Sequence, residues 1–214
     1  MRTAFAAALL ACTALAGVAL AQAPQLPQIQ VPATPQVPVV PPGMIPGTAA
    51  PAATQAPTPV GRAGGQFIDR EGRTIGSVTM VEAARGILIN ITINQGGLPA
   101  GRKGIHIHSV GTCDDRQAGF VASGGHLGAP GLPHGLLNPS SDYGDLPNLI
   151  VRADGGVEVE MFTTFASLAG AQGRGTILDN DGGALVVHQN PDDHFSQPIG
   201  GAGPRIACAV IRRQ

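Results

Sequence analysis

The segment 86–94 constrains the fold more than any other part of the sequence, because isoleucine occupies every second position in it. Ile87, Ile89, Ile91 and Ile93 alternate with residues of mixed polarity. Successive side chains of a β-strand point to opposite faces, so a period of two indicates a strand with one buried face. The segment therefore predicts a strand that lies between a core and solvent.

Other short apolar runs, separated by turn signals, surround this segment. Runs at 66–69 and 74–81, joined through Glu71-Gly72, predict an antiparallel meander with it. Further strands are expected at 104–110, 149–153, 157–162, 184–188 and 205–211. The chain has 31 glycines and 19 prolines, no tryptophan and no convincing helical pattern, which favours short strands and many turns. We predict an all-β sandwich or barrel over residues 64–214, interrupted by two long functional loops at 111–148 and 189–204.

The first sixty or so residues have a different character. Arg2, an uncharged apolar run at 4–20 and a small-x-small site ending at Ala21 predict a signal peptide over residues 1–21. The alternatives are a membrane anchor and a lipoprotein cleavage at Cys12. Between residues 22 and 60 there is no charge, and 11 of the 39 positions are proline. We expect a Pro-rich disordered linker over 22–63, either a plain tether or a ligand for a proline-recognising partner. The expected location is periplasmic or secreted.

Charge and cysteine content narrow the function classes. The formal net charge of −1 provides no basic surface, which argues against nucleic acid and anionic lipid as partners, and no stable membrane insertion is expected after signal cleavage. Cleavage also removes Cys12 and leaves Cys113 and Cys208. In an oxidising compartment a disulfide is the default for such a pair, and two separate buried thiols are the alternative.

All six histidines lie between positions 106 and 194. His106 and His108 alternate along one expected strand, so both imidazoles project from the same face and can converge on one ion. His188 ends an expected strand of four apolar residues, where a buried strand has no need of a polar ring. An all-imidazole ligand set suits copper, whereas histidine with carboxylate suits zinc. The first long loop adds four candidate ligands, which are His126, His134, Asp142 and Asp145.

Several motifs, taken together and in order, resemble the copper/zinc superoxide dismutases, especially their bacterial periplasmic branch. The motifs are Gly104-Ile105-His106-Ile107-His108, Gly124-Gly125-His126, Gly144-Asp145-Leu146-Pro147, Val187-His188 with Asp192-Asp193, and Gly201-Ala202-Gly203-Pro204-Arg205-Ile206-Ala207-Cys208. The resemblance covers the whole domain. It implies an eight-stranded antiparallel Greek-key sandwich or barrel, one copper and one zinc per chain, and superoxide as the substrate, with a homodimer as an option.

The resemblance also implies roles for individual residues. The implied copper ligands are His106, His108, His126 and His188. The implied zinc ligands are His126, which bridges to copper and carries a proton to the product, and His134 and Asp145. Asp192 falls on the carboxylate that links a copper-site histidine to a zinc-site histidine, which would fix the ring orientation of both. Arg205 falls on the arginine that attracts and orients the anionic substrate, and Cys113 and Cys208 fall on a disulfide.

Three features depart from the family pattern. Asp142 stands where the family places its third zinc histidine, so we expect a zinc site of His126, His134, Asp142 and Asp145, with an empty site as the alternative. The loop 189–204 is shorter and holds no lysine or arginine, so guidance of the anion would rest on Arg205, copper and the nearby 102–103 Arg-Lys pair. His194 has no counterpart among the ligands and is expected to be a surface loop residue.

Two other functions compete with the dismutase. One is a non-enzymatic copper-binding or copper-delivery module on the same fold, but such a protein would have little need of Arg205. The other is a zinc hydrolase built on His126, His134 and Asp145. It lacks an obvious general base and leaves the histidines of the two expected strands unexplained.

Overall fold

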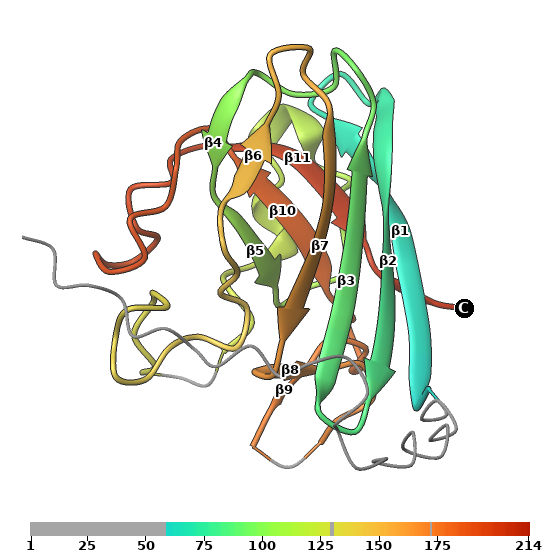
Figure 1. The fold of residues 1–214 in the computed structure, drawn as a ribbon, viewed down its shortest axis with the longest axis vertical. Coiled ribbons are helices and arrows are strands. Elements are labelled where there is room, and N and C mark those ends of the chain that lie inside the picture. Colours follow the sequence, from blue (N-terminus) through green and yellow to red (C-terminus); the bar gives the residue numbers. More distant parts are fainter. Residues whose placement is uncertain (1–58, 129–130, 172) are drawn as a thin grey trace, which may run out of the picture. The chain divides into compact units, whose positions relative to one another are not determined.

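The computed structural model describes residues 59–128, 131–171 and 173–214. The predicted signal peptide, and the predicted linker before residue 59, lie outside this range. The described residues form strands and two short 3-10 helices, Arg116–Ala118 and Val121–Ser123, and no α-helix (Figure 1). None of their helices is long and apolar enough to cross a membrane.

The strands form one large curled sheet and two small pairs (Figure 1). Their bounds are β1 Gly61–Asp69, β2 Thr74–Ala83, β3 Gly86–Ile93, β4 Gly101–Lys103, β5 Ile105–His108, β6 Leu149–Val151, β7 Val157–Thr163, β8 Ala166–Ser167, β9 Gly175–Thr176, β10 Ala184–His188, β11 Arg205–Val210 and β12 Arg212–Arg213. The large sheet has the order β5-β10-β11-β1-β2-β3-β7, and β12 pairs with β1. Every pair in it is antiparallel. The chain leaves β3 near one edge and enters β5 at the other, so the predicted Greek-key, all-β fold is confirmed.

The predicted strand pattern holds at β3. Ile87, Ile89, Ile91 and Ile93 are all buried, and the residues between them are half-buried or exposed. The structure adds four strands that the sequence did not indicate, β4, β8, β9 and β12, each only two or three residues long and too short to show a period. Strand β1 begins at Gly61, three residues before the expected domain boundary, because 61–63 pair with β2.

The histidine-bearing face of the sheet lies opposite the main core. Residues directly across an antiparallel pair share a face, and His106 lies opposite Val186 while His108 lies opposite Ala184. Val186 and Ala184 belong to a small second cluster, whereas the residues that alternate with them pack into the main core. His188 is two residues beyond Val186 and therefore shares their face. The metal-ligand candidates thus sit on the outer face, which the two long loops must cover.

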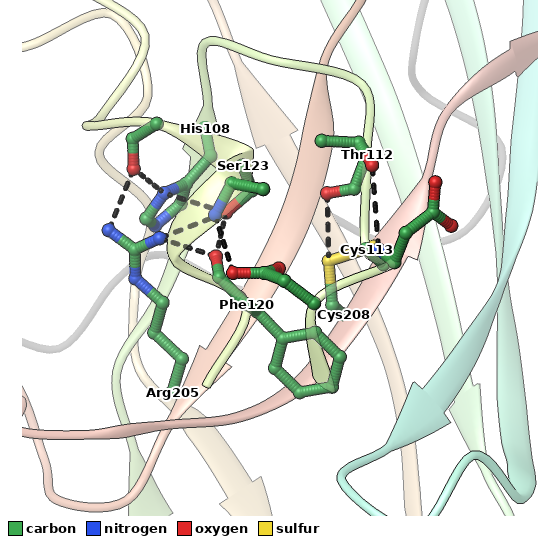
Figure 2. Close-up of a disulfide and its surroundings, with 11 residues drawn as sticks. His108, Thr112, Cys113, Phe120, Ser123, Arg205 and Cys208 are labelled. Carbon is green, nitrogen blue, oxygen red and sulfur yellow. Dashed lines mark hydrogen bonds between the residues drawn. A yellow bond between two sulfur atoms is a disulfide. The ribbon is translucent and has the colours of Figure 1, made fainter. Parts of the chain in front are cut away.

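A disulfide fastens the first loop to the sheet. Cys113 and Cys208 are joined with their Cα atoms 5.9 Å apart, so the prediction of a bond is confirmed and the alternative of two thiols is wrong. The second cluster forms around it, with Phe120 from the loop packed against the disulfide and β10. Figure 2 shows Phe120 beside the two cysteines. The loop 111–148 is therefore held at its first quarter by covalent and apolar contacts together.

Candidate metal centre

Four imidazoles converge beneath the loops. His106, His108, His126 and His188 each offer one ring nitrogen, and these four atoms all lie within 4.8 Å of one another. His106 and His108 come from β5, His188 from the end of β10, and His126 from the loop, where it forms an isolated bridge with His108. The structure therefore brings together all four of the predicted copper ligands.

Backbone carbonyls and one carboxylate determine which nitrogen each ring presents. His108 Nδ1–H donates to the carbonyl of Gly124 at 3.0 Å, and His188 Nδ1–H donates to the carbonyl of Gly203 at 2.9 Å. His106 Nε2–H donates to Asp192 at 2.8 Å. An imidazole that donates from one nitrogen keeps a lone pair on the other. The lone pairs therefore lie on His106 Nδ1 and on Nε2 of the other two rings.

Those same nitrogens have no hydrogen-bond partner among the described residues. His106 Nδ1, His108 Nε2, His188 Nε2 and both ring nitrogens of His126 are buried and unpaired. Buried polar atoms are rarely left unpaired in a native protein, and a role in binding an ion is one accepted reason for such atoms. Four imidazoles whose unpaired ring nitrogens converge are a donor set that copper accepts, so the residues present fit the implied copper ion.

A second group surrounds the other side of His126. Ligand atoms of His126, His134 and Asp145, together with His106, lie within 4.8 Å of one another. His134 Nδ1 is 2.7 Å from Asp145 Oδ1 and His126 Nδ1 is 3.6 Å from the same atom. Two imidazoles and a carboxylate are a zinc-type donor set. His126 belongs to both groups, as expected for a bridging ligand.

Asp142 lies at the edge of this second group. Its Oδ2 is 3.4 Å from His126 Nδ1, yet Asp142 is not among the four residues whose ligand atoms are mutually close. Its side chain is also more exposed than those of His126 and Asp145. Its role as a zinc ligand therefore stays a prediction.

Asp192 connects the two groups. Its Oδ2 accepts from His106 Nε2–H, and its Oδ1 accepts from His134 Nε2–H at 3.0 Å. Asn148 holds the backbone of Asp192 in turn, because its side chain accepts from the Asp192 N–H and donates to the Asp192 carbonyl, both at 2.8 Å. The structure therefore places Asp192 in the bridging position that the resemblance implies. A carboxylate that holds a ligating ring fixes its orientation.

The four converging histidines, His106, His108, His126 and His188, form the copper-type group. Burial sets the charge of three of them. It lowers the pKa of His106 to about 4 and the pKa of His188 to about 3, and it holds the pKa of His108 well below its usual value. The neighbouring charge of Arg205 adds to the effect at His108. The three rings are therefore neutral at pH 7 and free to donate to a metal ion.

The zinc-type group consists of His126, His134 and Asp145, with Asp142 at its edge. Hydrogen bonds favour the charged forms of its residues. Burial lowers the pKa of His134, but hydrogen bonds to Asp145 and Asp192 outweigh it and raise the value to about 10. Burial raises the pKa of Asp145 and of Asp192, yet hydrogen bonds to histidine outweigh burial and hold both pKa values well below the usual range. For His126, burial lowers the pKa but the carboxylates of Asp142 and Asp145 reverse the shift. A cation entering this group therefore displaces a proton and takes its place beside the carboxylates.

A cavity of about 530 Å³ opens onto the copper-type group. His108, His126, His188 and Arg205 lie on its wall. Arg205 Nη1 donates to the carbonyl of Phe120 at 2.6 Å and to Ser123 Oγ at 3.1 Å, and its Nη2 donates to the carbonyl of Gly124 at 2.7 Å. Figure 2 shows these bonds and the place of Arg205 beside His108. The loop thus holds a guanidinium at the entrance to the four imidazoles.

Comparison with known proteins agrees with this geometry. A family model described as copper/zinc superoxide dismutase (SODC) matches residues 74–211. The chain belongs to the copper/zinc superoxide dismutase family. A curated relative, "Superoxide dismutase [Cu-Zn]" of Caulobacter vibrioides, is 45% identical over 144 residues, which span 66% of this chain and 80% of that protein. "Superoxide dismutase [Cu-Zn] 2" of Aquifex aeolicus is 38% identical over 153 residues, or 71% and 86% of the two chains.

A solved structure of the same family supports the fold. A double mutant of a SOD-like protein from Bacillus subtilis superposes with a TM-score of 0.63 and 37% sequence identity, covering 68% of this chain and 94% of that one. The chain is therefore a bacterial-type copper/zinc superoxide dismutase in fold and sequence, and an oxidoreductase by family.

Some residues of this dismutase lie elsewhere than expected. Arg102 is exposed on β4 and Lys103 is buried, and neither lines the cavity. His194 is not a free surface residue, because its side chain is 17% exposed and its Nε2 lies 3.0 Å from Asn148 Nδ2. Arg70, which no sequence pattern indicated, lines the cavity.

Proposed function

We propose that His106, His108, His126 and His188 bind the catalytic copper of this dismutase, and that Arg205 draws superoxide to it. The observation that carries the proposal is the set of unpaired, buried ring nitrogens that converge beside a cavity with a guanidinium on its wall. When bound, copper supplies the one-electron redox chemistry by which two superoxide anions and two protons become dioxygen and hydrogen peroxide.

Arg205 is suited to binding the anion. A guanidinium has five N–H donors, and three contacts occupy part of the Arg205 group while its Nε–H has no partner among them. Because the loop carbonyls already fix its position, the charge needs no reorganisation when an anion arrives. Arg205 therefore orients superoxide toward the face where the imidazoles meet.

His126 is proposed to carry the proton. It is the one ring with both nitrogens unpaired among the described residues, Nδ1 on the side of the carboxylates and Nε2 on the side of the copper-type group. A ring held from the Nδ1 side can hold a proton at Nε2 and deliver it to the departing peroxide. No separate general acid is then required in the cavity.

An assay of copper-loaded protein tests the assignment. We expect the full chain to accelerate the loss of superoxide, and His188→Ala to lose most of the activity and the tight copper site. Thr92→Ala is the control, because it removes an exposed side chain of β3, a strand that carries no candidate ligand. Equal activity of His188→Ala and the unsubstituted protein would refute the assignment, and copper binding without activity would favour the non-enzymatic module.

We also propose that zinc is retained, with Asp142 completing His126, His134 and Asp145. The 3.4 Å approach of Asp142 to His126 supports this. Elemental analysis after loading with both metals should find about one zinc beside one copper, and Asp142→Ala should lower the zinc content without removing copper. If zinc stays near zero in the unsubstituted protein, the proposal is wrong, and Asp142→His should then restore it.

Export is proposed as the setting of this enzyme, because a disulfide such as that between Cys113 and Cys208 is typical of an oxidising compartment and rare in the cytosol. Cell fractionation with an antibody to the domain tests it, and a protein found only in the cytoplasm would refute it.

The homodimer is a separate proposal, for which sedimentation velocity should give about twice the mass of one chain. Sedimentation as a monomer at micromolar concentration would exclude it.

A further inference from the structure

The cavity over the copper-type group has a second guanidinium on its wall. Among the described residues that line it, Arg70 and Arg205 are the only arginine or lysine side chains, and Asp142 is the only carboxylate. The permanent charges around the opening therefore sum to a positive value. Arg205 is accounted for by the proposed function, whereas Arg70 is not.

Arg70 reaches the cavity from the turn between β1 and β2. Its Nη2 donates to the carbonyl of Gln117 at 3.2 Å, and Arg116 Nη1 returns a bond to the carbonyl of Glu71 at 3.1 Å. Two reciprocal bonds thus tie the turn to the first long loop. The guanidinium also lies over Gly119, 3.8 Å from the place where a Cβ would stand. The turn is therefore docked against the wall of the cavity.

The charge of Arg70 is not neutralised locally. Arg73 takes the nearby carboxylates, with Asp69 at 2.6 Å and Glu71 at 3.7 Å. Within the described part of the chain, no carboxylate oxygen lies within 4.0 Å of Arg70. The side chain is exposed and uses one of its five N–H donors. It is therefore available to an anion in solution.

One loop segment positions both cations. The carbonyl of Gln117 accepts from Arg70, and the carbonyls of Phe120 and Gly124 accept from Arg205. The two guanidinium groups are therefore held on the same segment, one exposed and one half-buried at the histidines. An anion that enters from solvent therefore meets the exposed Arg70 before the half-buried Arg205.

We propose that Arg70 is a second anion-guiding residue of this enzyme, which draws superoxide into the cavity ahead of Arg205. The inference rests on the proposed function insofar as the anion is superoxide. It also explains how the enzyme can work with a loop 189–204 that holds no lysine or arginine, since the cation is supplied by the β1–β2 turn instead.

The expected effect follows from the size of the cavity. A volume of about 530 Å³ corresponds to a sphere about 10 Å across. A unit charge at about 10 Å in water changes the local concentration of a monovalent anion about twofold at low ionic strength. Removing the charge should therefore slow capture about twofold, and reversing it should slow capture about fourfold.

Three substitutions and one control test the proposal in the full chain loaded with copper and zinc. Arg70→Gln removes the charge, Arg70→Glu reverses it, and Arg70→Lys keeps it. The control Arg213→Glu makes the same change in net charge on an exposed residue of β12, which pairs with β1 at Ala63. That place is roughly 20 Å along the strand from Arg70, at about 3.3 Å per residue.

Two readouts separate guidance from damage. The first is the second-order rate constant for superoxide, and the second is the dissociation constant of azide for the oxidised copper centre, measured by visible absorption. Both should worsen about twofold in Arg70→Gln and about fourfold in Arg70→Glu at low ionic strength. They should stay close to the unsubstituted values in Arg70→Lys and Arg213→Glu. The differences should vanish near 1 M salt, where the Debye length is about 3 Å.

Two outcomes would overturn the proposal. In one, Arg70→Glu behaves like Arg213→Glu in both readouts. In the other, its loss persists unchanged at high salt, which would mean that the turn and loop have moved. The azide readout does not depend on turnover. A chain without dismutase activity that still shows the graded azide effect would therefore refute the proposed function while supporting the role of Arg70 in anion capture.

Discussion

Reduction of the Cys113–Cys208 bond should remove a large part of the stability of this domain. The two cysteines are 95 residues apart in sequence, so the bond closes most of the domain into one loop. In the chain-entropy treatment a loop of that length destabilises the unfolded state by about 4.7 kcal/mol. For a domain of this size the loss corresponds to a fall in Tm of about 9–19 °C.

Breaking the disulfide should also loosen the proposed active site. The disulfide and Phe120 pack together, and the Phe120 carbonyl accepts a hydrogen bond from Arg205. A loosened loop releases one of the groups that fix the guanidinium. We therefore expect reduced, metal-loaded protein to lose part of its rate with superoxide while keeping its copper, whose proposed ligands lie mostly on β5 and β10.

Urea unfolding of the metal-free protein measures the stability effect without a contribution from metal binding. The oxidised protein is compared with the reduced protein and with the double variant Cys113→Ser/Cys208→Ser. Adding reductant to the double variant is the control and should change nothing. If oxidised and reduced protein differ by less than about 1 kcal/mol, the bond does not act through the unfolded chain as reasoned here.

Three further substitutions should change stability in predictable ways, measured by urea unfolding of metal-free protein. Ile89→Ala removes a fully buried side chain from β3 and should lower the free energy of unfolding by about 2–5 kcal/mol. Glu82→Ala should lower it by about 1–3 kcal/mol, because the buried Glu82 carboxylate accepts from the Leu168 N–H at 2.8 Å, and Glu82→Gln should retain most of that bond. Burial raises the pKa of Asp69, but its bonds to Arg73 outweigh this and lower the pKa below its usual value. The Asp69 carboxylate should therefore contribute fully to the free energy of unfolding above pH 4 to 5, and its contribution should decline as the pH falls below about 4. The difference in the free energy of unfolding between the unsubstituted protein and Asp69→Asn should accordingly narrow in acid. A gap that stays constant from pH 6 to pH 3 would contradict this.

Local periodicity accounts for what the sequence could predict. A period of two identifies β3 and places His106 and His108 on one face of β5, because alternation is a property of each strand alone. The loops are different, since their course depends on partners far away in sequence. The resemblance to the family supplied His126 and His134, whose spacing alone would not have distinguished a ligand from an ordinary loop residue.

The contacts that the sequence could not predict join segments without a shared pattern. Arg70 meets the Gln117 carbonyl across 47 residues, and a backbone carbonyl leaves no signature in a sequence. The buried face was equally hidden, because all four residues of β5 are buried and only the pairing with β10 shows which side faces the core. His194 was expected at the surface, and its contact with Asn148 depends on two loops meeting.

Asp142 is a departure from the family pattern in the zinc-type group, and the contacts show how much of the copper-type group it can affect. Three copper-type rings are oriented by the carbonyls of Gly124 and Gly203 and by Asp192, and the backbone of Asp192 is held by Asn148. None of these contacts involves Asp142, whose only close approach to the group is to His126. Asp142, where the resemblance implies a histidine, therefore affects the charge and reach of the zinc-type group and the surroundings of His126, while the orientations of His106, His108 and His188 are fixed independently of it.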